Sequence, residues 1–331
     1  MWKNFKPNLF HLTENKRVLN NQQDFAEFLL KMGNGKLETD ENDFVEIPAH
    51  CVVKTNAEAP KKVKDDSNEK KIDAVRRQLV EDVFGPFIEN ADFQGMSQRM
   101  ILASKNETVV EINNMILDRL ARKGHKLTTM YGVDTVDEGD PFENYILYPP
   151  EFLHGLYGSG LPPYELRLMK GCPVMLVRNL NPAAGLSNGT RLTIVSIHDH
   201  ILVCKIINGD KKFVGEKVMI PRMKLESNDE FPFKLTRRQF PVKPCFAMTM
   251  NKCQGQTIEF VGLDMTKATF SHGQCYVAFS RVRGWDFIKV AVDPEKGNKV
   301  LNVVWKEVLF EDENVSMPPP ATTPRTSRVS K

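Results

Sequence analysis

The sequence predicts an α/β protein into which a small antiparallel β unit is inserted. A short apolar run, RMILAS, leads directly into a helical pattern at residues 106–124, and this order is half of a βαβ unit. Short β-type runs separated by turn residues fill residues 172–222, and strand and helix patterns alternate again after residue 245. With 331 residues, the chain is long enough for two folding units.

The N-terminal third predicts helices and one buried strand. Residues 16–32 place apolar side chains at helical spacing and end at Gly33, whereas residues 54–71 are polar and predict an exposed loop. The segment IDAVRRQLVEDVF predicts an amphipathic helix that ends at Gly85-Pro86. The strand RMILAS and a helix ending at Gly124 follow.

The middle and C-terminal parts predict strands first and a mixed pattern afterwards. Asn188-Gly189 and Asn208-Gly209 are hairpin signals between β-type runs, which predicts a small antiparallel barrel or sheet. CFAMTM and FIKVAV predict strands, HGQCYVAFSRV a helix, and NKVLNVVWKEVLF a closing helix. The tail from Asn314 to Lys331 is rich in Pro, Ser and Thr and is predicted to be disordered.

Composition is that of a globular protein with a core, at 41% apolar and 26% charged residues. The net charge, 45 − 42 = +3, is too small to indicate a nucleic-acid partner, but residues 211–252 hold ten Lys/Arg against four Asp/Glu, a local excess of +6. No apolar run approaches the roughly 18 residues that span a bilayer, and the N-terminus lacks a secretory pattern. No membrane partner is expected.

The six cysteines form no CxxC pair and have no His at ligand spacing. We therefore expect reduced, buried thiols and no metal site.

Three segments carry candidate chemistry: LTENKR at residues 12–17, FAMTMNKCQGQTI at 246–258, and FSHGQCYVAFSRV at 270–282. The second offers a Lys, an Asn, a Thr hydroxyl and backbone amides, which suit phosphates, although a solvated connection fits the same residues. The third predicts an amphipathic helix. Arg281 near its end would satisfy terminal carbonyls in the simplest interpretation.

Together and in this order, the three segments closely resemble the late motifs of the Pif-type DNA helicases, a branch of superfamily one. The likeness is strongest to the transposon-associated group that includes the Helitron helicases. It covers roughly residues 1–310 and includes GCPVMLVRNLNPAAGLSNGTRL and FPFKLTRRQFPVKP. The resemblance implies a RecA-like second motor domain at residues 1–149 and 241–311, an inserted small β-barrel at 150–240, and a disordered tail at 312–331.

The resemblance also implies roles for individual residues. Arg17 and Arg281 match the two arginines that reach the γ-phosphate of ATP, a task suited to rigid guanidinium groups. The expected contacts to the backbone of single-stranded DNA are Thr249, Asn251, Lys252 and Cys253. The residues expected to couple this groove to the ATP cleft are Gln254, Gly255, Gln274 and Tyr276.

Two further matches leave alternatives open. Arg237 and Arg238, in the RRQFP segment, would contact DNA or would simply be surface charge. Asn106, in the KN…IN pattern, would cap the following helix or contact DNA.

The departures from the family pattern matter as well. Cys253 replaces the usual serine, and no GxxxxGK[ST] loop occurs, because residues 33–36 have neither the spacing nor the hydroxyl. In the family, the P-loop and the Mg²⁺-binding acidic motif precede LTENKR, so the first motor domain is expected to be missing. ATP and Mg²⁺ would act in the complete enzyme, and neither is expected to bind tightly to this chain alone.

The sequence thus favours the C-terminal motor half of an ATP-dependent, 5′-to-3′ DNA helicase, with single-stranded DNA and a first motor domain as partners. A non-catalytic, single-stranded-DNA-binding remnant is the alternative, and a half-motor that does not fold alone is a third. The resemblance implies the nucleus, with mitochondria as a second compartment. It leaves DNA repair, recombination, telomere maintenance and transposition open as roles.

Overall fold

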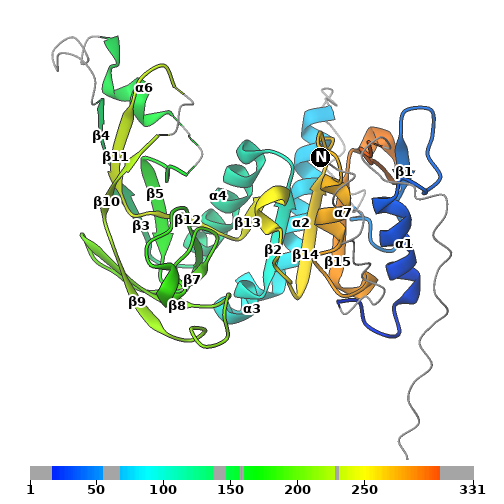
Figure 1. Cartoon of the computed structure of the whole chain (residues 1–331), viewed down its shortest axis with the longest axis horizontal. Coiled ribbons are helices and arrows are strands. Elements are labelled where there is room, and N and C mark those ends of the chain that lie inside the picture. Colours follow the sequence, from blue (N-terminus) through cyan, green and yellow to red (C-terminus); the bar gives the residue numbers. More distant parts are fainter. Residues whose placement is uncertain are drawn as a thin grey trace, which may run out of the picture.

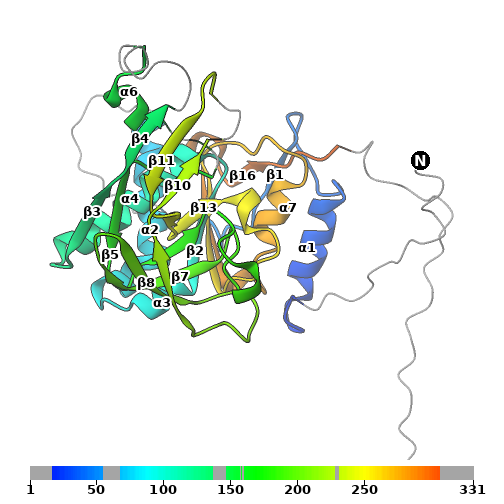
Figure 2. The ribbon, with the colours of Figure 1, turned by 60° about the vertical axis from the view of Figure 1, so that its left-hand side comes forward.

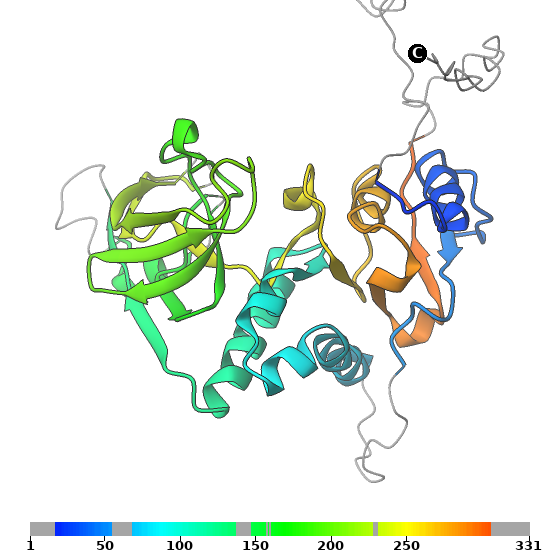
Figure 3. The same cartoon turned by 90° about the horizontal axis from the view of Figure 1, so that it is seen from below.

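The computed structural model describes residues 17–54, 68–136, 147–156, 158, 160–227 and 231–305. The described chain has a parallel-sheet part and an antiparallel part, with helix α4 (Asn106–Arg122) between them (Figure 1). Seen from below, the segment that follows the antiparallel part returns past α4 into the parallel sheet (Figure 3). The α/β fold with antiparallel strands is therefore confirmed.

The parallel sheet has the strand order β13-β2-β14-β15, and every neighbouring pair is parallel. Apolar side chains of α2 and α4 form one core with the sheet, and those of α1 and α7 form a second. A right-handed βαβ architecture needs both faces covered in this way, because buried parallel strands are apolar on both sides. The elements are β13 (Ala247–Thr249), β2 (Arg99–Ala103), β14 (Phe260–Met265), β15 (Ile288–Val292), α1 (Gln23–Gly33), α2 (Asn68–Glu89) and α7 (Gln274–Phe279).

The antiparallel part contains three hydrogen-bonded sheets, ordered β12-β6-β7-β8-β9, β10-β11-β4 and β3-β5. The Asn-Gly sites lie between antiparallel neighbours, β6 with β7 and β8 with β9, and Gly189 and Gly209 take positive φ angles of 89° and 104°. The connections are longer than the predicted hairpin turns, because residues 177–190 and 207–216 separate the paired strands. The strands are β3 (Leu127–Tyr131), β4 (Val133–Val136), β5 (Glu165–Met169), β6 (Pro173–Leu176), β7 (Arg191–Ile197), β8 (Ile201–Ile206), β9 (Lys217–Pro221), β10 (Met223–Glu226), β11 (Leu235–Gln239) and β12 (Val242–Pro244).

Shorter elements connect these layers. Strand β1 (Phe44–Glu46) pairs with β16 (Lys299–Leu301) beside α1, as Figure 2 shows. The others are α3 (Phe93–Ser97), α6 (Pro150–His154), and the 3₁₀ helices η3 (Pro182–Ala184), η4 (Met250–Cys253), η5 (Trp285–Phe287) and η6 (Pro294–Lys296).

Two predicted elements differ from the structure. Helix α2 does not end at Gly85-Pro86 but continues to Glu89, because a proline removes one helical hydrogen bond while Phe84 and Ile88 keep the helix packed on the core. Residues 299–301, predicted to be helical, form β16 instead, where the β-branched Val300 pairs with Val45. Residues 306–310 of that predicted helix lie outside the described residues.

The strand pairing bears on the domain limits. Strands β3 and β4 precede residue 150, yet they pair with β5 and β11 of the inserted segment. The limits at residues 150 and 240 stay predictions. The predicted tail at 312–331 and residues 55–67 of the predicted loop lie outside the described residues, whereas residues 68–71 begin α2. All six cysteines are free and buried, as expected.

Candidate functional site

Arg281 lies just beyond the end of α7 and is buried, with 7% of its surface exposed. Its Nε donates to the carbonyl of Val277 at 2.7 Å, which satisfies a terminal carbonyl as the simplest interpretation predicted. Its Nη1 donates to the carbonyls of Cys253 and Gln256 at 3.3 and 3.2 Å, and its Nη2 donates to Ser280 Oγ at 2.7 Å. Arg281 therefore ties the loop after η4 to the end of α7.

Arg17 lies at the same end of α7. Its Nη1 donates to the carbonyl of Ser280 at 2.7 Å. Burial, followed by the charge of Arg17, lowers the pKa of Arg281. The structure thus brings together two arginines that are far apart in the sequence, and the charge of Arg17 acts on Arg281. The rest of the LTENKR segment lies outside the described residues.

Beside this arginine pair is a cleft of about 600 Å³. Thr257 and Arg283 line it together with Arg17, and neither was singled out from the sequence. The signal for Arg283 was available, because it follows Arg281 by two residues in the SRVRG segment. The lining residues are Arg17, Val18, Leu19, Asn20, Thr257 and Arg283.

The four predicted coupling residues fall into two groups. Gln254 and Gly255 are exposed in the loop that Arg281 holds, and Gly255 has a φ of 78°. Gln274 lies at the opposite end of α7, buried, and its Oε1 accepts from the N–H of Phe270 at 3.1 Å. Tyr276 is 40% exposed and lies against Gly33 of α1. The structure does not bring Gln274 to the arginine pair, whereas Tyr276 lies near enough to Arg281 to act on its charge.

A groove of about 820 Å³ runs between α4, β5 and the segment from β12 to η4. It brings together three predicted DNA contacts, namely Asn106, Thr249 and Lys252. Because the first turn of α4 opens onto it, unpaired backbone N–H groups and the positive end of the helix dipole lie at the groove. The lining residues are Asn106, Glu107, Val109, Val110, Asn113, Asn114, Gly158, Pro163, Glu165, Arg167, Met175, Lys243, Pro244, Ala247, Met248, Thr249 and Lys252.

Asn113 fixes the wall of this groove. Its Oδ1 accepts from the backbone N–H groups of Phe246 and Ala247 at 2.9 and 3.0 Å. Its Nδ2 donates to the carbonyls of Val109 and Ala247 at 2.9 and 3.1 Å. One buried side chain therefore clamps β13 against α4, which holds the strand that leads to Thr249 in place.

The capping alternative for Asn106 is wrong. Asn106 is the first residue of α4, and the N-cap position belongs to Lys105, which makes no side-chain capping bond. Asn106 is exposed and lines the groove instead.

The thiol of Cys253 is not available for a DNA contact, contrary to the expectation. The residue is fully buried, its Sγ–H donates to the carbonyl of Met250 at 2.8 Å, and burial raises its pKa to about 11. On the short η4 helix, Cys253 faces the core while Lys252 faces the groove. Asn251 is exposed but does not line the groove.

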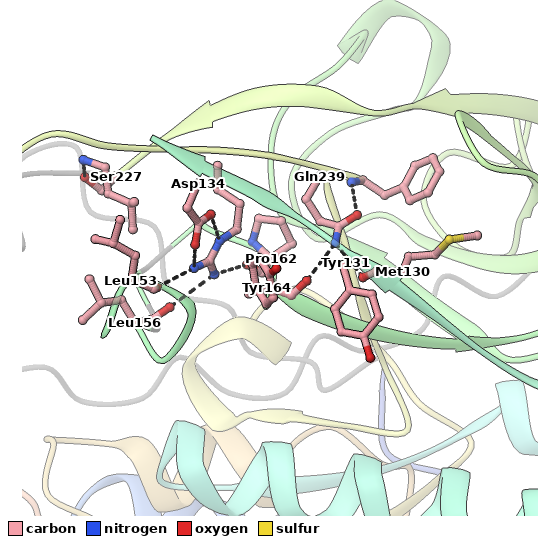
Figure 4. A network of polar contacts seen from close by, with 12 residues as sticks. Met130, Tyr131, Asp134, Leu153, Leu156, Pro162, Tyr164, Ser227 and Gln239 are labelled. Carbon is pink, nitrogen blue, oxygen red and sulfur yellow. Dashed lines mark hydrogen bonds and ion pairs between the residues drawn. The ribbon is translucent and has the colours of Figure 1, made fainter. Parts of the chain in front are cut away.

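The structure also corrects the prediction that Arg237 contacts DNA. Its side chain is fully buried, with Nε 2.7 Å and Nη2 2.8 Å from the two carboxylate oxygens of Asp134. The remaining N–H groups donate to the carbonyls of Leu153, Leu156 and Pro162 (Figure 4). A group with all five donors engaged inside the protein cannot reach a phosphate.

Arg238, unlike Arg237, has an exposed side chain. This exposure is expected for the neighbour of an inward-facing residue on a strand, and Arg238 lies on the outer face of the β10-β11-β4 sheet rather than in the groove.

No cluster of three or more His, Cys, Asp or Glu side chains that could hold a metal ion occurs among the residues that the structure describes. Within the same residues, none of the helices has the length and apolar content needed to span a bilayer.

Comparison with known proteins gives consistent matches. Residues 151–197 match the family model described as DNA helicase Pif1, 2B domain. The ATP-dependent DNA helicase PIF6 of Trypanosoma brucei brucei is 36% identical over 138 residues, which cover 39% of this chain and 16% of that protein. The ATP-dependent DNA helicase PIF1 of Xenopus laevis is 29% identical over 132 residues, which cover 38% of this chain and 19% of that protein. The chain thus spans less than a fifth of either relative.

The fold is similar to that of a solved Pif1 structure. A crystal structure of Bacteroides Pif1 bound to single-stranded DNA superposes with a TM-score of 0.50 and 19% identity, over 86% of this chain and 51% of that chain. The family model and the curated relatives thus show that this chain is similar to Pif-type DNA helicases over part of its length.

Proposed function

We propose that the chain is the C-terminal motor half of an ATP-dependent DNA helicase that moves 5′ to 3′ along one strand. The groove at the start of α4 carries this proposal, since Asn106, Thr249 and Lys252 line it beside the exposed helix N-terminus. Backbone amides, a hydroxyl and an ammonium group bind phosphates without reading base sequence. A sequence-tolerant grip on the sugar-phosphate backbone is what a translocating motor requires.

The arginine pair supports a role in ATP hydrolysis. Arg17 lines the cleft, and its guanidinium suits a γ-phosphate whose charge grows during transfer. Arg281 acts mainly as a positioning residue in this proposal, because its contacts connect α7 to the carbonyls of Cys253 and Gln256. Cys253 follows Lys252 directly and Gln256 lies four residues after Lys252, so a movement at the cleft would be transmitted to the groove.

ATP and Mg²⁺ would be held mainly by a first motor domain. The 331 residues contain no GxxxxGK[ST] loop, and the described residues offer no carboxylate cluster for a metal ion. The cationic cleft fits the phosphates of ATP but not Mg²⁺. Bound Mg²⁺ would neutralise charge between the β- and γ-phosphates, while this chain would supply the facing guanidinium groups.

Salt-dependent binding of single-stranded DNA tests the proposal. We expect the affinity of the chain for an oligonucleotide to fall steeply as salt rises, because phosphate contacts release counterions. Lys252→Ala should weaken binding and lower the slope of log K against log salt by about 0.7. Lys212→Ala, an exposed lysine that does not line the groove, is the control. Equal slopes for all three proteins would contradict the proposed groove.

The alternative is a non-catalytic DNA-binding remnant, and the lack of a GxxxxGK[ST] loop in these 331 residues favours it. Measurements of ATP turnover distinguish the two. The 331 residues alone should not hydrolyse ATP above background, and a DNA-stimulated turnover that Arg281→Ala abolishes would contradict this. Turnover that appears when a Pif-type first motor domain is added in trans would support the helicase. Intact DNA binding without such turnover would support the remnant. A location in the nucleus stays a prediction.

A further inference from the structure

An exposed tyrosine lies on the strand that pairs with one wall of the groove. Tyr131 ends strand β3 and is 57% exposed, whereas its neighbour Met130 points into the core of the antiparallel part. In the register with β5, Tyr131 lies opposite Glu165 and Thr129 lies opposite Arg167. Both of those β5 residues line the groove.

The contacts of β3 and β5 with α4 therefore change along the two strands. At one end, Leu127 and Met169 pack with the core that includes α4. In the next row, Arg167 Nη1 donates to Asn114 Oδ1 on α4 at 3.2 Å. Tyr131 stands one row further, beyond the last contact with α4, and side chains two residues apart on a strand share a face. Its ring consequently extends the groove wall past Arg167.

The backbone around Tyr131 is held firmly. Its carbonyl accepts from Arg222 Nη1 at 2.7 Å, and the next N–H, of Gly132, donates to the carbonyl of Tyr164 at 2.8 Å. The rings of Tyr131 and Tyr164 are 5.9 Å apart at 49°, and the ring of His154 stacks on Tyr164 at 3.5 Å and 13°. Figure 4 shows Tyr131 pointing away from the buried network on the side of α4.

We propose that Tyr131 is a stacking platform for a nucleobase of the single strand that the groove holds. This inference rests on the proposed function and adds a residue that contacts a base rather than a phosphate. An aromatic ring on a rigid support loses little entropy on binding, and bases of any identity stack on it. The groove would grip the phosphates at α4 and η4, and Tyr131 would support a base where the strand passes β3.

Binding of normal and abasic oligonucleotides to Tyr131→Ala tests this inference. For an unmodified single strand, the affinity should fall by about 5- to 150-fold, the loss of one base–aromatic stack, with the salt slope unchanged. For an abasic strand of equal length, the variant and the original chain should bind equally, because no base is present to stack. Tyr131→Phe and Tyr131→Trp should retain binding. Phe152→Ala, at an exposed aromatic residue of α6 outside the groove, is the control.

The outcomes are separable. An unchanged affinity of Tyr131→Ala for the unmodified strand, or an equal loss for both strands, would overturn the stacking role. If Tyr131→Ala melts well below the original chain, the comparison of the Phe and Trp variants on both strands decides in its place. The Lys252→Ala slope tests the groove independently, so Tyr131 can fail while the proposed function stands.

Discussion

Arg237 in the antiparallel part and Arg281 in the parallel part are both buried, and the two are stabilised differently. In the antiparallel part, Arg237 forms a bidentate pair with Asp134, so the positive charge is neutralised inside the protein. In the parallel part, Arg281 donates only to carbonyls and a hydroxyl among the described residues, and a second arginine, Arg17, lies beside it. Arg237 is thus neutralised by a buried carboxylate, whereas Arg281 has no carboxylate partner among the described residues.

In our proposal, Arg237 is a structural arginine and Arg281 belongs to a ligand site. Burial of a charge is costly unless an opposite charge accompanies it. Asp134 offsets this cost for Arg237 within the fold. At Arg281, carbonyl and hydroxyl acceptors offset part of this cost, and in our proposal a bound phosphate adds to this offset.

The largest expected effect is a loss of stability when Arg237 is replaced. Arg237→Ala would leave Asp134 buried and unpaired, so the free energy of unfolding should fall by about 3–5 kcal/mol. Denaturant unfolding measures the loss, and the adjacent, exposed Arg238→Ala should change it by no more than about 0.5 kcal/mol. Equal, small changes in both variants would mean that Arg237 is not a structural residue.

A smaller effect on the free energy of unfolding is expected at Cys253, whose carbonyl accepts from Arg281. Burial raises the pKa of this thiol to about 11 from its ordinary value of 9.0, so the folded state holds the proton more tightly than the unfolded state. Its contribution to stability is complete below pH 9 and is lost as the pH rises to about 11, a change of up to about 2–3 kcal/mol.

Unfolding of Cys253→Ala across this pH range measures the contribution. The difference in unfolding free energy between the original chain and the variant should shrink as the pH rises from 9 to 11. A constant difference would indicate an exposed thiol, and a DNA contact by Cys253 would then become tenable.

The smallest effect is stabilisation by an anion at Arg17 and Arg281. Pyrophosphate at ten times its dissociation constant should stabilise the chain by about 1.4 kcal/mol, because it binds the folded arginine pair and not the unfolded chain. Thermal melting at constant ionic strength should show a saturable shift for the original chain and none for Arg17→Ala. A shift of the same size in the variant would mean that the anion binds elsewhere. It would contradict the proposal that Arg281, unlike Arg237, belongs to a ligand site.

The sequence predicts three of the four parallel strands because their signals are local, whereas β14 is not among the predicted strands. RMILAS, the helix after it and the Asn-Gly turns each specify their own conformation. Helix α2 and strand β16 were misjudged because tertiary packing outweighed Pro86 and pairing with β1 outweighed a helical pattern. A strand partner 255 residues away, as in Val45 and Val300, leaves no trace in a sequence window.

The site residues show the same limit. The resemblance singles out Arg237 and Arg238 as one motif, yet strand alternation buries the first and exposes the second. Cys253 and Lys252 separate in the same way on η4. Tyr131 has no motif at all, and only the register with β5 places it at the groove.

The most direct measurement is photo-crosslinking of a single strand that carries 4-thiothymidine, followed by mapping of the crosslinked peptides. The account predicts crosslinks in the first turns of α4, in residues 163–167 and in residues 243–252, with a further crosslink at Tyr131. Crosslinks confined to the outer face around Arg238, or no crosslink in the groove at saturating DNA, would contradict it.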